Sequence, residues 1–484
     1  MAATNIRLKE PSLLRFNVTD PANGDIIGSC PASDSKDTQK AIDTAAAALP
    51  AWRFRTGRNR GRLLRRWYEL IMENQQDLAT LITLENGKAK ADAAGEILFA
   101  TSFLEWFSEE AARVYGDGDA IPHSQPNFRV SVLKESVDVC GLITPWNFPA
   151  AMITRKLGPA LAAGCTVVVK TAGETSFTAN ALIKLSERPG IPAGVINSVN
   201  ALENTADIGQ ALCSSETVRK FSFTGFTRIG KLLMQQSSNS FKKLGLELGG
   251  NAPFIVFQDA DLDLAVDAAI ASKFKSSGQT CVCSNRIYVQ KGIYTEFIQR
   301  LKNAVIQFRV GNGFDEKTIH GLLIHSAAVE RVAGLVDDAV KWRAKVEIGG
   351  KRRAELGANF FGPTIITGVI PAMRLVNEEI FNPVAPIFCF ETEDEVVASS
   401  NACDVGLAAY IFTQDVTRLN RVSELLQFGM MAINTGVISD AASPFSGIKH
   451  SGMGREGSKY GIDDYLQTKT VVIGNVRIVH KSSL

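Results

Sequence analysis

The 484-residue sequence lacks the features of several protein classes. No apolar window reaches the roughly 20 residues of a membrane-spanning helix, and the N-terminus has no apolar core of a signal peptide. Its 52 basic and 50 acidic side chains are spread along the chain, and its five histidines form no HExxH or paired C-x-x-C pattern. We therefore expect a cytoplasmic protein with no membrane span, no nucleic-acid partner and no metal site.

Cysteines are few, and most are scattered in apolar surroundings. The eight of them show no disulfide framework, which predicts free, mostly buried thiols in a reducing compartment. Two differ from the rest, because Cys281 and Cys283 lie together in the polar, glycine-bearing stretch FKSSGQTCVCSNR. A pair of thiols in such a setting suggests chemistry rather than packing.

The order of the predicted elements indicates an α/β protein with two lobes. Helical periodicity covers residues 37–84, and short apolar runs then alternate with helical stretches, as in CTVVVK, GVINSV and KFSFTG. A second series follows GLELGGNAPFIVF, with strands at RIYVQ, KVEIGG and APIFCF. The chain is longer than one core usually spans, and we expect two α/β lobes joined near residue 248.

Two strand ends carry residues suited to a nucleotide. KFSFTGFTRIG predicts a strand, a turn at Gly225 and a helix whose first N–H groups can meet a pyrophosphate, although any turn glycine after a strand looks the same. Lys170 follows the buried strand VVVK, where it is either a solvated loop charge or a ligand of a ribose or phosphate.

Two further stretches suit acyl or aldehyde chemistry. In TPWNFP, two prolines hold Asn147 in a non-helical turn and aim its amide in one direction, as an oxyanion donor requires, or the stretch is a structural turn around a packed Trp146. In GLELGGN, Glu247 lies between leucines. It is either a base with a raised pKa or a partnered core carboxylate.

Five motifs together carry a family resemblance. PWNFP, ELGGN, GQTC, EEIFNPV and PFSGIKHSGMGREG occur in the order and at the spacings of the aldehyde dehydrogenase superfamily, over essentially the whole chain. The stretches MITRKLGPALAAGCTVVVK, GQTCVCSNR and REGSKYGIDDYL most resemble succinate-semialdehyde dehydrogenases.

The resemblance implies a mechanism built on a cysteine. Cys281 would add to the aldehyde carbonyl, and the Asn147 amide and the Cys281 N–H would hold the oxyanion. After hydride transfer to a nicotinamide, Glu247 would activate water to hydrolyse the thioester. Lys156 is implied as a further residue of this site, on the nicotinamide-ribose side.

The resemblance also implies cofactor and substrate positions. Trp146, Lys170 and Gly225 would lie on the adenosine-diphosphate side, and Glu379 and Phe381 with Lys156 on the nicotinamide side. Many NAD-preferring relatives have Glu where this chain has Gly173, so we predict that NADP is accepted as well as NAD. The positions that would bind the carboxylate of a semialdehyde are Arg155, Lys275 and Ser439.

Several positions depart from the family pattern. Phe226 replaces a serine near the pyrophosphate, and relatives usually have Arg in place of Lys275. Ser276, Asn382, Ser446 and Thr171 also differ. They leave open a specialised dehydrogenase with another aldehyde substrate, or a catalytically weak nucleotide-binding scaffold. A coenzyme-A-acylating enzyme is disfavoured by Glu247, and a cysteine hydrolase by the lack of a histidine in a pairing motif.

Two expectations concern regulation and assembly. Cys283 is either a resolving thiol for oxidised Cys281 or a packing residue. The resemblance implies a cofactor domain of residues 1–117 and 137–248, a catalytic domain of 249–448, and an oligomerisation arm with the C-terminal segment at 118–136 and 449–484. In the arm, a strand pair near 118–136 would combine with TVVIGNVRIV. Its exposed strand edges predict a homodimer or homotetramer.

Overall fold

The computed structural model of the protein describes residues 14–114 and 121–476. The chain begins with a hairpin of β1 (Arg15–Thr19) and β2 (Ile26–Pro31). Four helices follow: α1 (Ser35–Arg53), α2 (Gly57–Glu73), α3 (Gln75–Asn86) and α4 (Lys90–Glu110). The helical periodicity predicted over 37–84 is therefore confirmed.

The first lobe is built on a six-stranded sheet in the order β18-β8-β7-β4-β5-β6, which is parallel except for β18. Its strands are β4 (Val139–Ile143), β5 (Thr166–Thr171), β6 (Ile196–Asn200), β7 (Val218–Thr224), β8 (Lys243–Glu247) and β18 (Gly452–Met453). The helices between them are α5 (Ala151–Ala163), α6 (Ser176–Leu185), α7 (Thr205–Ser214) and α8 (Thr227–Ser237).

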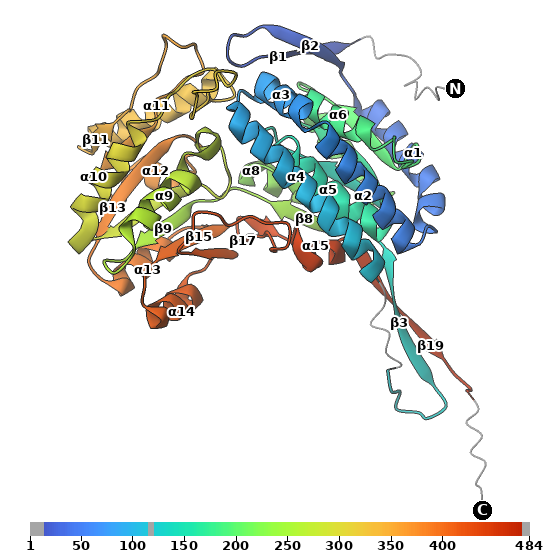
Figure 1. The fold of residues 1–484 in the computed structure, drawn as a ribbon. Coiled ribbons are helices and arrows are strands. Elements are labelled where there is room, and N and C mark those ends of the chain that lie inside the picture. The colour runs from blue at the N-terminus through green and yellow to red at the C-terminus, as the bar shows by residue number, and fades with distance from the viewer. Residues whose placement is uncertain (1–13, 115–120, 477–484) are drawn as a thin grey trace, which may run out of the picture.

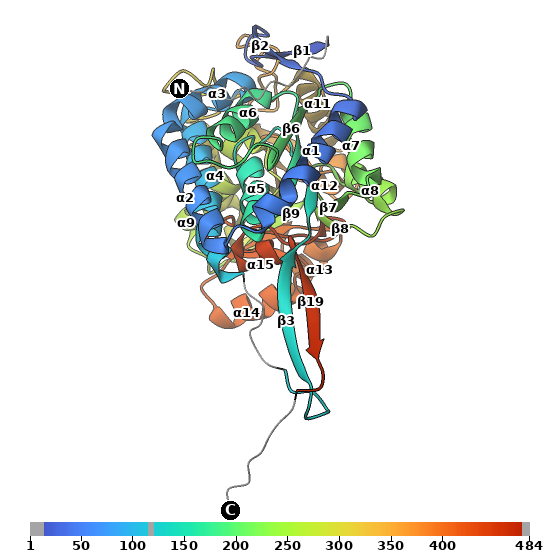
Figure 2. The ribbon, with the colours of Figure 1, turned by 90° about the vertical axis from the view of Figure 1, so that its right-hand side faces the viewer.

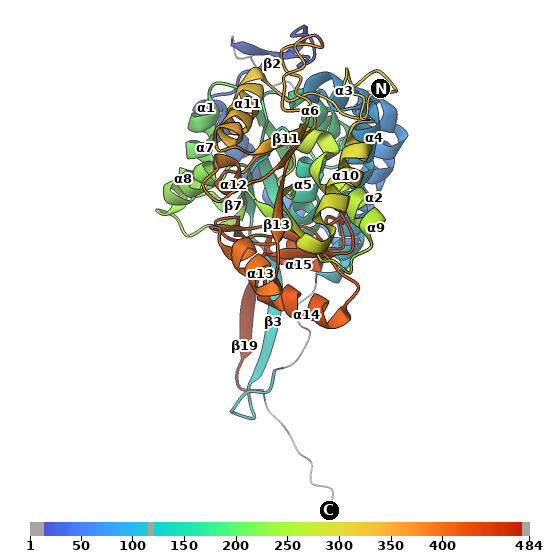
Figure 3. The ribbon, with the colours of Figure 1, turned by 90° about the vertical axis from the view of Figure 1, so that its left-hand side faces the viewer.

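The second lobe has a seven-stranded sheet in the order β11-β12-β13-β10-β9-β15-β16, in which only β11 is antiparallel. Its strands are β9 (Ala252–Val256), β10 (Ser284–Gln290), β11 (Lys345–Ile348), β12 (Thr364–Thr367), β13 (Val384–Phe390), β15 (Ala408–Phe412) and β16 (Met430–Ile433). Its helices are α9 (Leu262–Lys273), α10 (Tyr294–Val305), α11 (Ser326–Lys341), α12 (Arg374–Asn377), α13 (Glu393–Asn401) and α14 (Val416–Leu425). Figure 1 shows the two lobes side by side, and Figure 3 shows the helices of the second lobe from its outer side.

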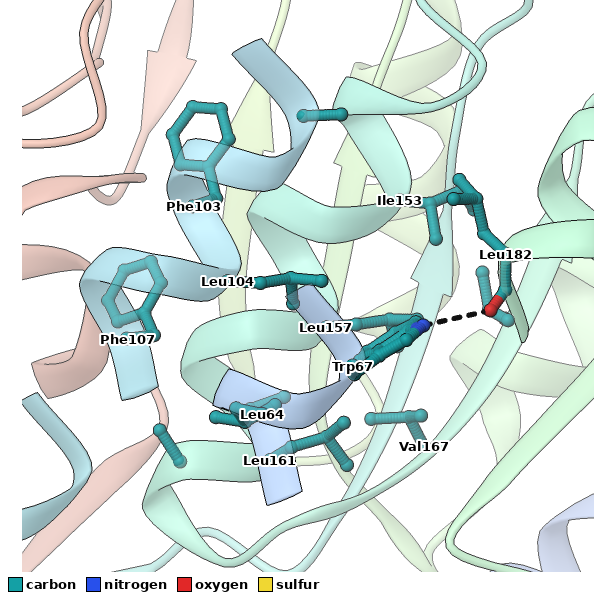
Figure 4. Packing of buried hydrophobic residues seen from close by; sticks show 14 of the residues in the cluster. Leu64, Trp67, Phe103, Leu104, Phe107, Ile153, Leu157, Leu161, Val167 and Leu182 are labelled. Atoms are coloured by element: carbon teal, nitrogen blue, oxygen red, sulfur yellow. Dashed lines mark hydrogen bonds between the residues drawn. The ribbon is translucent and has the colours of Figure 1, made fainter. Parts of the chain in front are cut away.

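A core of apolar residues joins the helices α2, α4 and α5 to the first sheet. Leu64, Trp67, Leu104 and Leu157 are fully buried in it. The Trp67 indole also donates a hydrogen bond of 3.0 Å to the Leu182 carbonyl of α6 (Figure 4). This packing fixes α4 and α5 relative to each other, and both helices begin beside the functional site described below.

The arm is an antiparallel pair of β3 (Arg129–Ser136) and β19 (Leu466–Ile473), which projects from the body (Figure 2). The strand pair predicted near 118–136 corresponds, in the described residues, to one strand, β3, with an isolated antiparallel bridge between Ile121 and Val130. The C-terminal strand already begins at Leu466, before the predicted TVVIGNVRIV. Residues 115–120 and 477–484, which the prediction included, lie outside the described residues. Before β19, the C-terminal segment contains β18, which extends the first sheet, and α15 (Ser458–Asp463).

All eight cysteines lie in the described part of the chain and all are free, as predicted. Five are buried, and Cys389 is exposed. Within residues 14–114 and 121–476, no helix combines the length and the apolar character that crossing a membrane requires.

Candidate active site

A cleft lies where loops at the carboxyl ends of β4, β7 and β8 meet two segments of the second lobe. In a parallel sheet these ends open to one edge, where α/β proteins bind their ligands. The cleft is lined by Pro145, Trp146, Asn147, Phe148, Met152, Thr224, Gly225, Phe226, Glu247, Leu248, Gly249, Cys281, Glu379 and Phe381. It therefore brings together eight of the residues that the sequence singled out.

Cys281 follows a tight turn between α9 and β10. Ser276, Ser277 and Gly278 all have left-handed backbones, with φ of 49°, 56° and 73°. A side chain at Gly278 would approach the Asn382 carbonyl to 2.5 Å, so this position requires glycine. A left-handed backbone is unfavourable for the two serines, and backbone strain of this kind is concentrated at functional sites.

Asn147 is anchored to that turn by a hydrogen bond. Its Nδ2 donates to the Gln279 carbonyl at 3.0 Å, and the side chain of Gln279 is itself held by Leu322 and Ile324. An amide nitrogen carries two hydrogens, so the second N–H of Asn147 remains for a ligand in the cleft. The bond to Gln279 thus orients the donor and joins the two lobes.

Glu247, the last residue of β8, is a buried carboxyl group whose hydrogen-bonding capacity is unsatisfied. Neither carboxylate oxygen has a hydrogen-bond partner among the described residues. Burial raises the pKa of Glu247 well above its usual value, and the charge of Glu456 adds to this, while Arg155 and Lys156 oppose it. A carboxyl group with these properties can accept a proton near neutral pH.

The Cys281 thiol is half-buried beside these groups. Burial raises its pKa to about 12, the nearby Arg155 lowers it, and Glu379 and Glu247 raise it further. The thiol is therefore protonated near pH 7 in this state. Its use as a nucleophile requires a base, and Glu247 lines the same cleft.

Lys156 and Arg155 lie behind the cleft rather than among its lining residues. The Lys156 ammonium contacts Glu456 and donates to Ser222 at 2.8 Å. The Arg155 Nε is 2.7 Å from Glu456. Burial alone would raise the pKa of Glu456, but the two cations hold it at about 2. Sequence analysis gave Glu456 no role, although it stands in the quoted GREG motif; only the fold shows that it faces residues 300 positions away.

The two remaining substrate candidates are not brought into the cleft lining either. Lys275 is exposed at the start of the left-handed turn, and Ser439 is half-buried in the loop after β16. The Arg155 guanidinium has five N–H donors, so its ion pair with Glu456 leaves donors for a second anion.

The cofactor candidates form two groups. Glu379 accepts a hydrogen bond from the Gly250 N–H at 3.0 Å, and burial raises its pKa to about 7. Phe381 packs edge-on against Trp146 with ring centroids 5.9 Å apart. Lys170 is buried at the end of β5, where burial lowers its pKa to about 8.

The residues present fit a dinucleotide. The α8 N-terminus has no side-chain cap at Phe226, so its first N–H groups stay available, and the buried Thr224 hydroxyl has no partner among the described residues. The Phe226 ring, 57% exposed, stands at this mouth of the cleft. Gly173 lies against the loop after β6, because an added Cβ would come within 2.8 Å of Leu202 and 2.9 Å of the Ala201 carbonyl.

Two α/β lobes that enclose a cysteine, a buried carboxylate and an oriented amide define a class of proteins with covalent cysteine chemistry beside a nucleotide site. Comparison with known proteins gives the family. Residues 9–471 match the model of the aldehyde dehydrogenase family, and the chain belongs to that family.

The similarity to individual members is high over nearly full length. The chain is 52% identical to the glutarate-semialdehyde dehydrogenase of Pseudomonas putida, and the match covers 95% of this chain and 94% of the relative. It is also 52% identical, with the same coverage, to the NADP(+) succinate-semialdehyde dehydrogenase of Escherichia coli. The crystal structure of the Burkholderia pseudomallei succinate-semialdehyde dehydrogenase superposes with a TM-score of 0.93, at 50% identity and 95% coverage of each chain. The fold and the family that the sequence predicted are confirmed.

Proposed function

We propose that the protein oxidises a small aldehyde with a carboxylate at its far end, succinate or glutarate semialdehyde, to the dicarboxylic acid. NADP or NAD, when bound, accepts the hydride. The observation that carries the proposal is the unsatisfied, buried Glu247 in one cleft with Cys281 and Asn147. The printed activities of the two relatives at 52% identity support the choice of substrate.

The residues divide the chemistry into two halves. Glu247 takes the proton of Cys281, whose sulfur adds to the aldehyde carbon, and the free N–H of Asn147 donates to the oxygen that becomes negative. Once the hydride has left that carbon, a thioester remains on Cys281. Glu247 first releases to solvent the proton that it took from Cys281. It then takes a proton from water, the hydroxide adds to the thioester carbon, and the C–S bond breaks to free the acid, while the departing thiolate takes its proton back from Glu247.

The substrate carboxylate would be held by Arg155, Lys275 and Ser439. Arg155 already faces Glu456, so the exposed Lys275, which has no ion-pair partner among the described residues, would supply the positive charge for this carboxylate. Lysine binds a carboxylate as a point charge rather than as a two-pronged donor. This arrangement accommodates dicarboxylate chains of more than one length.

NADP is accepted, in this proposal, because no acidic side chain stands at position 173. Lys170 lies three residues earlier and can pair with a 2′-phosphate. Lys156, Trp146, Gly225, Phe226, Glu379 and Phe381 complete the cofactor positions proposed here.

We assign residues 1–117 and 137–248 to cofactor binding, 249–448 to catalysis, and 118–136 with 449–484 to the arm and C-terminal segment. The two sheets support the division near 248. The arm exposes Leu133, Val472 and Ile473 on a two-stranded ribbon, which supports a homodimer or homotetramer. The eight free cysteines support a reducing, cytoplasmic location. A monomer mass by light scattering would contradict the assembly.

The test is the absorbance of reduced cofactor with succinate semialdehyde, glutarate semialdehyde and the uncharged butanal, each with NAD and with NADP. We expect wild type to prefer the two semialdehydes and Cys281→Ala to show no turnover. Preference for butanal would reject the carboxylate site. Cofactor binding by calorimetry without turnover of any aldehyde would favour the nucleotide-binding scaffold.

A further inference from the structure

Residues 85–96 comprise the end of α3, the connection to α4 and the first two turns of α4, and they carry buried polar side chains that the proposed chemistry does not use. We call this stretch the junction segment. Glu85 accepts hydrogen bonds of 2.8 Å from the N–H groups of Phe177 and Thr178, in the first turn of α6. Asn86 donates to the Trp146 carbonyl at 2.9 Å. The segment therefore contacts the backbone of both the cofactor side and the Asn147 loop.

Its next residues hold the start of α5. Glu96 accepts from the Ala150 N–H at 2.8 Å and is the ion-pair partner of Lys88 at 2.5 Å. The Lys88 ammonium also lies 3.6 Å from the centre of the Phe148 ring, which lines the cleft. Lys88 and Glu96 are 5% and 2% exposed. The loop that carries Asn147 is therefore held by contacts at Trp146, Phe148 and Ala150.

Asp92, in the first turn of α4, contacts the turn that precedes Cys281. Its Oδ2 accepts a hydrogen bond of 3.1 Å from the N–H of Ser276, the first left-handed residue of the turn before Cys281. A left-handed serine is unfavourable by itself, so an anchored N–H helps to hold it. The bond from Asn147 to the Gln279 carbonyl joins this turn directly to the loop that carries Asn147.

We propose that Asp92, Lys88 and Glu96 of the junction segment are positioning residues that set the Asn147 donor and the Cys281 turn in register for the reaction. This inference rests on the proposed roles of Cys281 and Asn147. Asp92 holds the turn that carries Cys281, and the Lys88–Glu96 pair holds the loop that carries Asn147. Both are attached to α4, which the Trp67 core holds rigidly against α5. Small misplacements of reacting groups cost up to about 10²-fold in rate, so register of this kind has a kinetic value.

The most informative variant is Asp92→Ala. Asp92 is only half-buried, and its replacement removes one hydrogen bond, the one from the Ser276 N–H. We expect kcat to fall about tenfold, while the cofactor Kd by calorimetry stays at the wild-type value and the urea midpoint falls only slightly, as the loss of one hydrogen bond implies. Alkylation of Cys281 by iodoacetamide, followed by mass spectrometry of its peptide, should change in rate because the turn has moved. Asp92→Asn keeps an oxygen acceptor and should restore kcat to within about threefold of wild type. Glu109→Ala, exposed on the same helix, is the matched control and should behave as wild type.

The second pair of variants tests the loop that carries Asn147. Glu96→Gln keeps an acceptor for the Ala150 N–H but leaves Lys88 unpaired, and Lys88→Met with Glu96→Gln removes both charges. The double variant should keep the fold and cofactor binding and still lose kcat about tenfold, because the Lys88 cation no longer lies over the Phe148 ring.

A wild-type kcat and a wild-type alkylation rate in Asp92→Ala would overturn the inference. Large and parallel losses of kcat, cofactor binding and urea midpoint would also overturn it, because they would assign Asp92 a role in folding rather than in positioning. Wild type that turns over no aldehyde would instead reject the proposed function, and the alkylation rates would still report on the turn.

Discussion

Glu96 and Glu247 are two buried carboxylates, one bonded to the loop that carries Asn147 and one lining the cleft with it, and they differ in how their oxygens are satisfied. Glu96 accepts a backbone N–H and pairs with Lys88. Glu247 has no hydrogen-bond partner on either oxygen among the described residues. A buried carboxylate that is saturated holds the structure in place, whereas one that is left unsatisfied beside a thiol is available for proton transfer.

Glu456 is intermediate between them. Its two cations, Lys156 and Arg155, keep it ionised, and its charge in turn raises the pKa of Glu247. The three carboxylates are therefore distinguished by their neighbours rather than by their burial.

The largest expected effect is on turnover, and it concerns the unsatisfied carboxylate. Glu247→Gln keeps the shape and removes the base, so steady-state kcat should fall about 10³-fold, or about 4 kcal/mol in barrier. The midpoint of urea unfolding should not fall, because no partner is lost. A variant with more than a tenth of wild-type kcat would place the base elsewhere.

The saturated carboxylate should show the opposite behaviour. Glu96→Ala leaves the Lys88 ammonium buried without its partner, and we expect a loss of about 3 kcal/mol in unfolding free energy. Lys88→Met with Glu96→Gln should recover most of this loss. Equal stability of the single and double variants in urea melts would show that the pair adds nothing.

His320 extends the comparison to a buried group outside the cleft. Neither ring nitrogen has a partner among the described residues, and the ring lies between Phe274 and Phe308. Burial lowers its pKa from 6.5 to about 4. Between these values the unfolded chain takes up a proton that the folded protein does not, so the stability is full above pH 6.5 and is lost as the pH falls toward 4.

From pH 8 to pH 5 this term amounts to about 2 kcal/mol of unfolding free energy. His320→Phe should reduce the acid dependence by that amount, and the exposed His450→Gln should leave it unchanged. The measurement is the urea midpoint as a function of pH. An unchanged slope in His320→Phe would assign the acid sensitivity to other groups.

The smallest expected effect concerns the cofactor. Gly173→Glu places a carboxylate near Lys170 and should lower the NADP-to-NAD ratio of kcat/KM about tenfold, or about 1.4 kcal/mol. An added Cβ would meet both the Leu202 side chain and the Ala201 carbonyl, so the substitution is made together with Leu202→Ala, which relieves the side-chain contact, and the loop after β6 must shift to relieve the backbone contact. The uncharged Gly173→Gln with Leu202→Ala is the control, and a matching shift in it would assign the effect to shape.

The sequence predicted the fold, the family and the local features of the site. Paired prolines around Asn147, leucines around Glu247 and the glycine-bearing turn before Cys281 are all readable within a few residues. The partners of Lys156 and the anchor of Ser276 are not, because Glu456 and Asp92 lie about 300 and 184 positions away in the chain. β19 begins at Leu466, before the predicted strand TVVIGNVRIV, because its first residues, LQTK, are mostly polar and exposed and give no clear strand alternation.

The most direct test of the contrast between the two carboxylates is a rapid-mixing measurement of reduced cofactor with Glu247→Gln and succinate semialdehyde. Glu247 has two roles in the account, since it takes the Cys281 proton before addition and a proton from water before hydrolysis. At neutral pH, Glu247→Gln should therefore show no burst and should reduce the cofactor at about 10⁻³ of the wild-type rate. A burst of about one equivalent per site followed by arrest would contradict the role of Glu247 in activating the thiol, and a linear time course at the wild-type rate would contradict both roles.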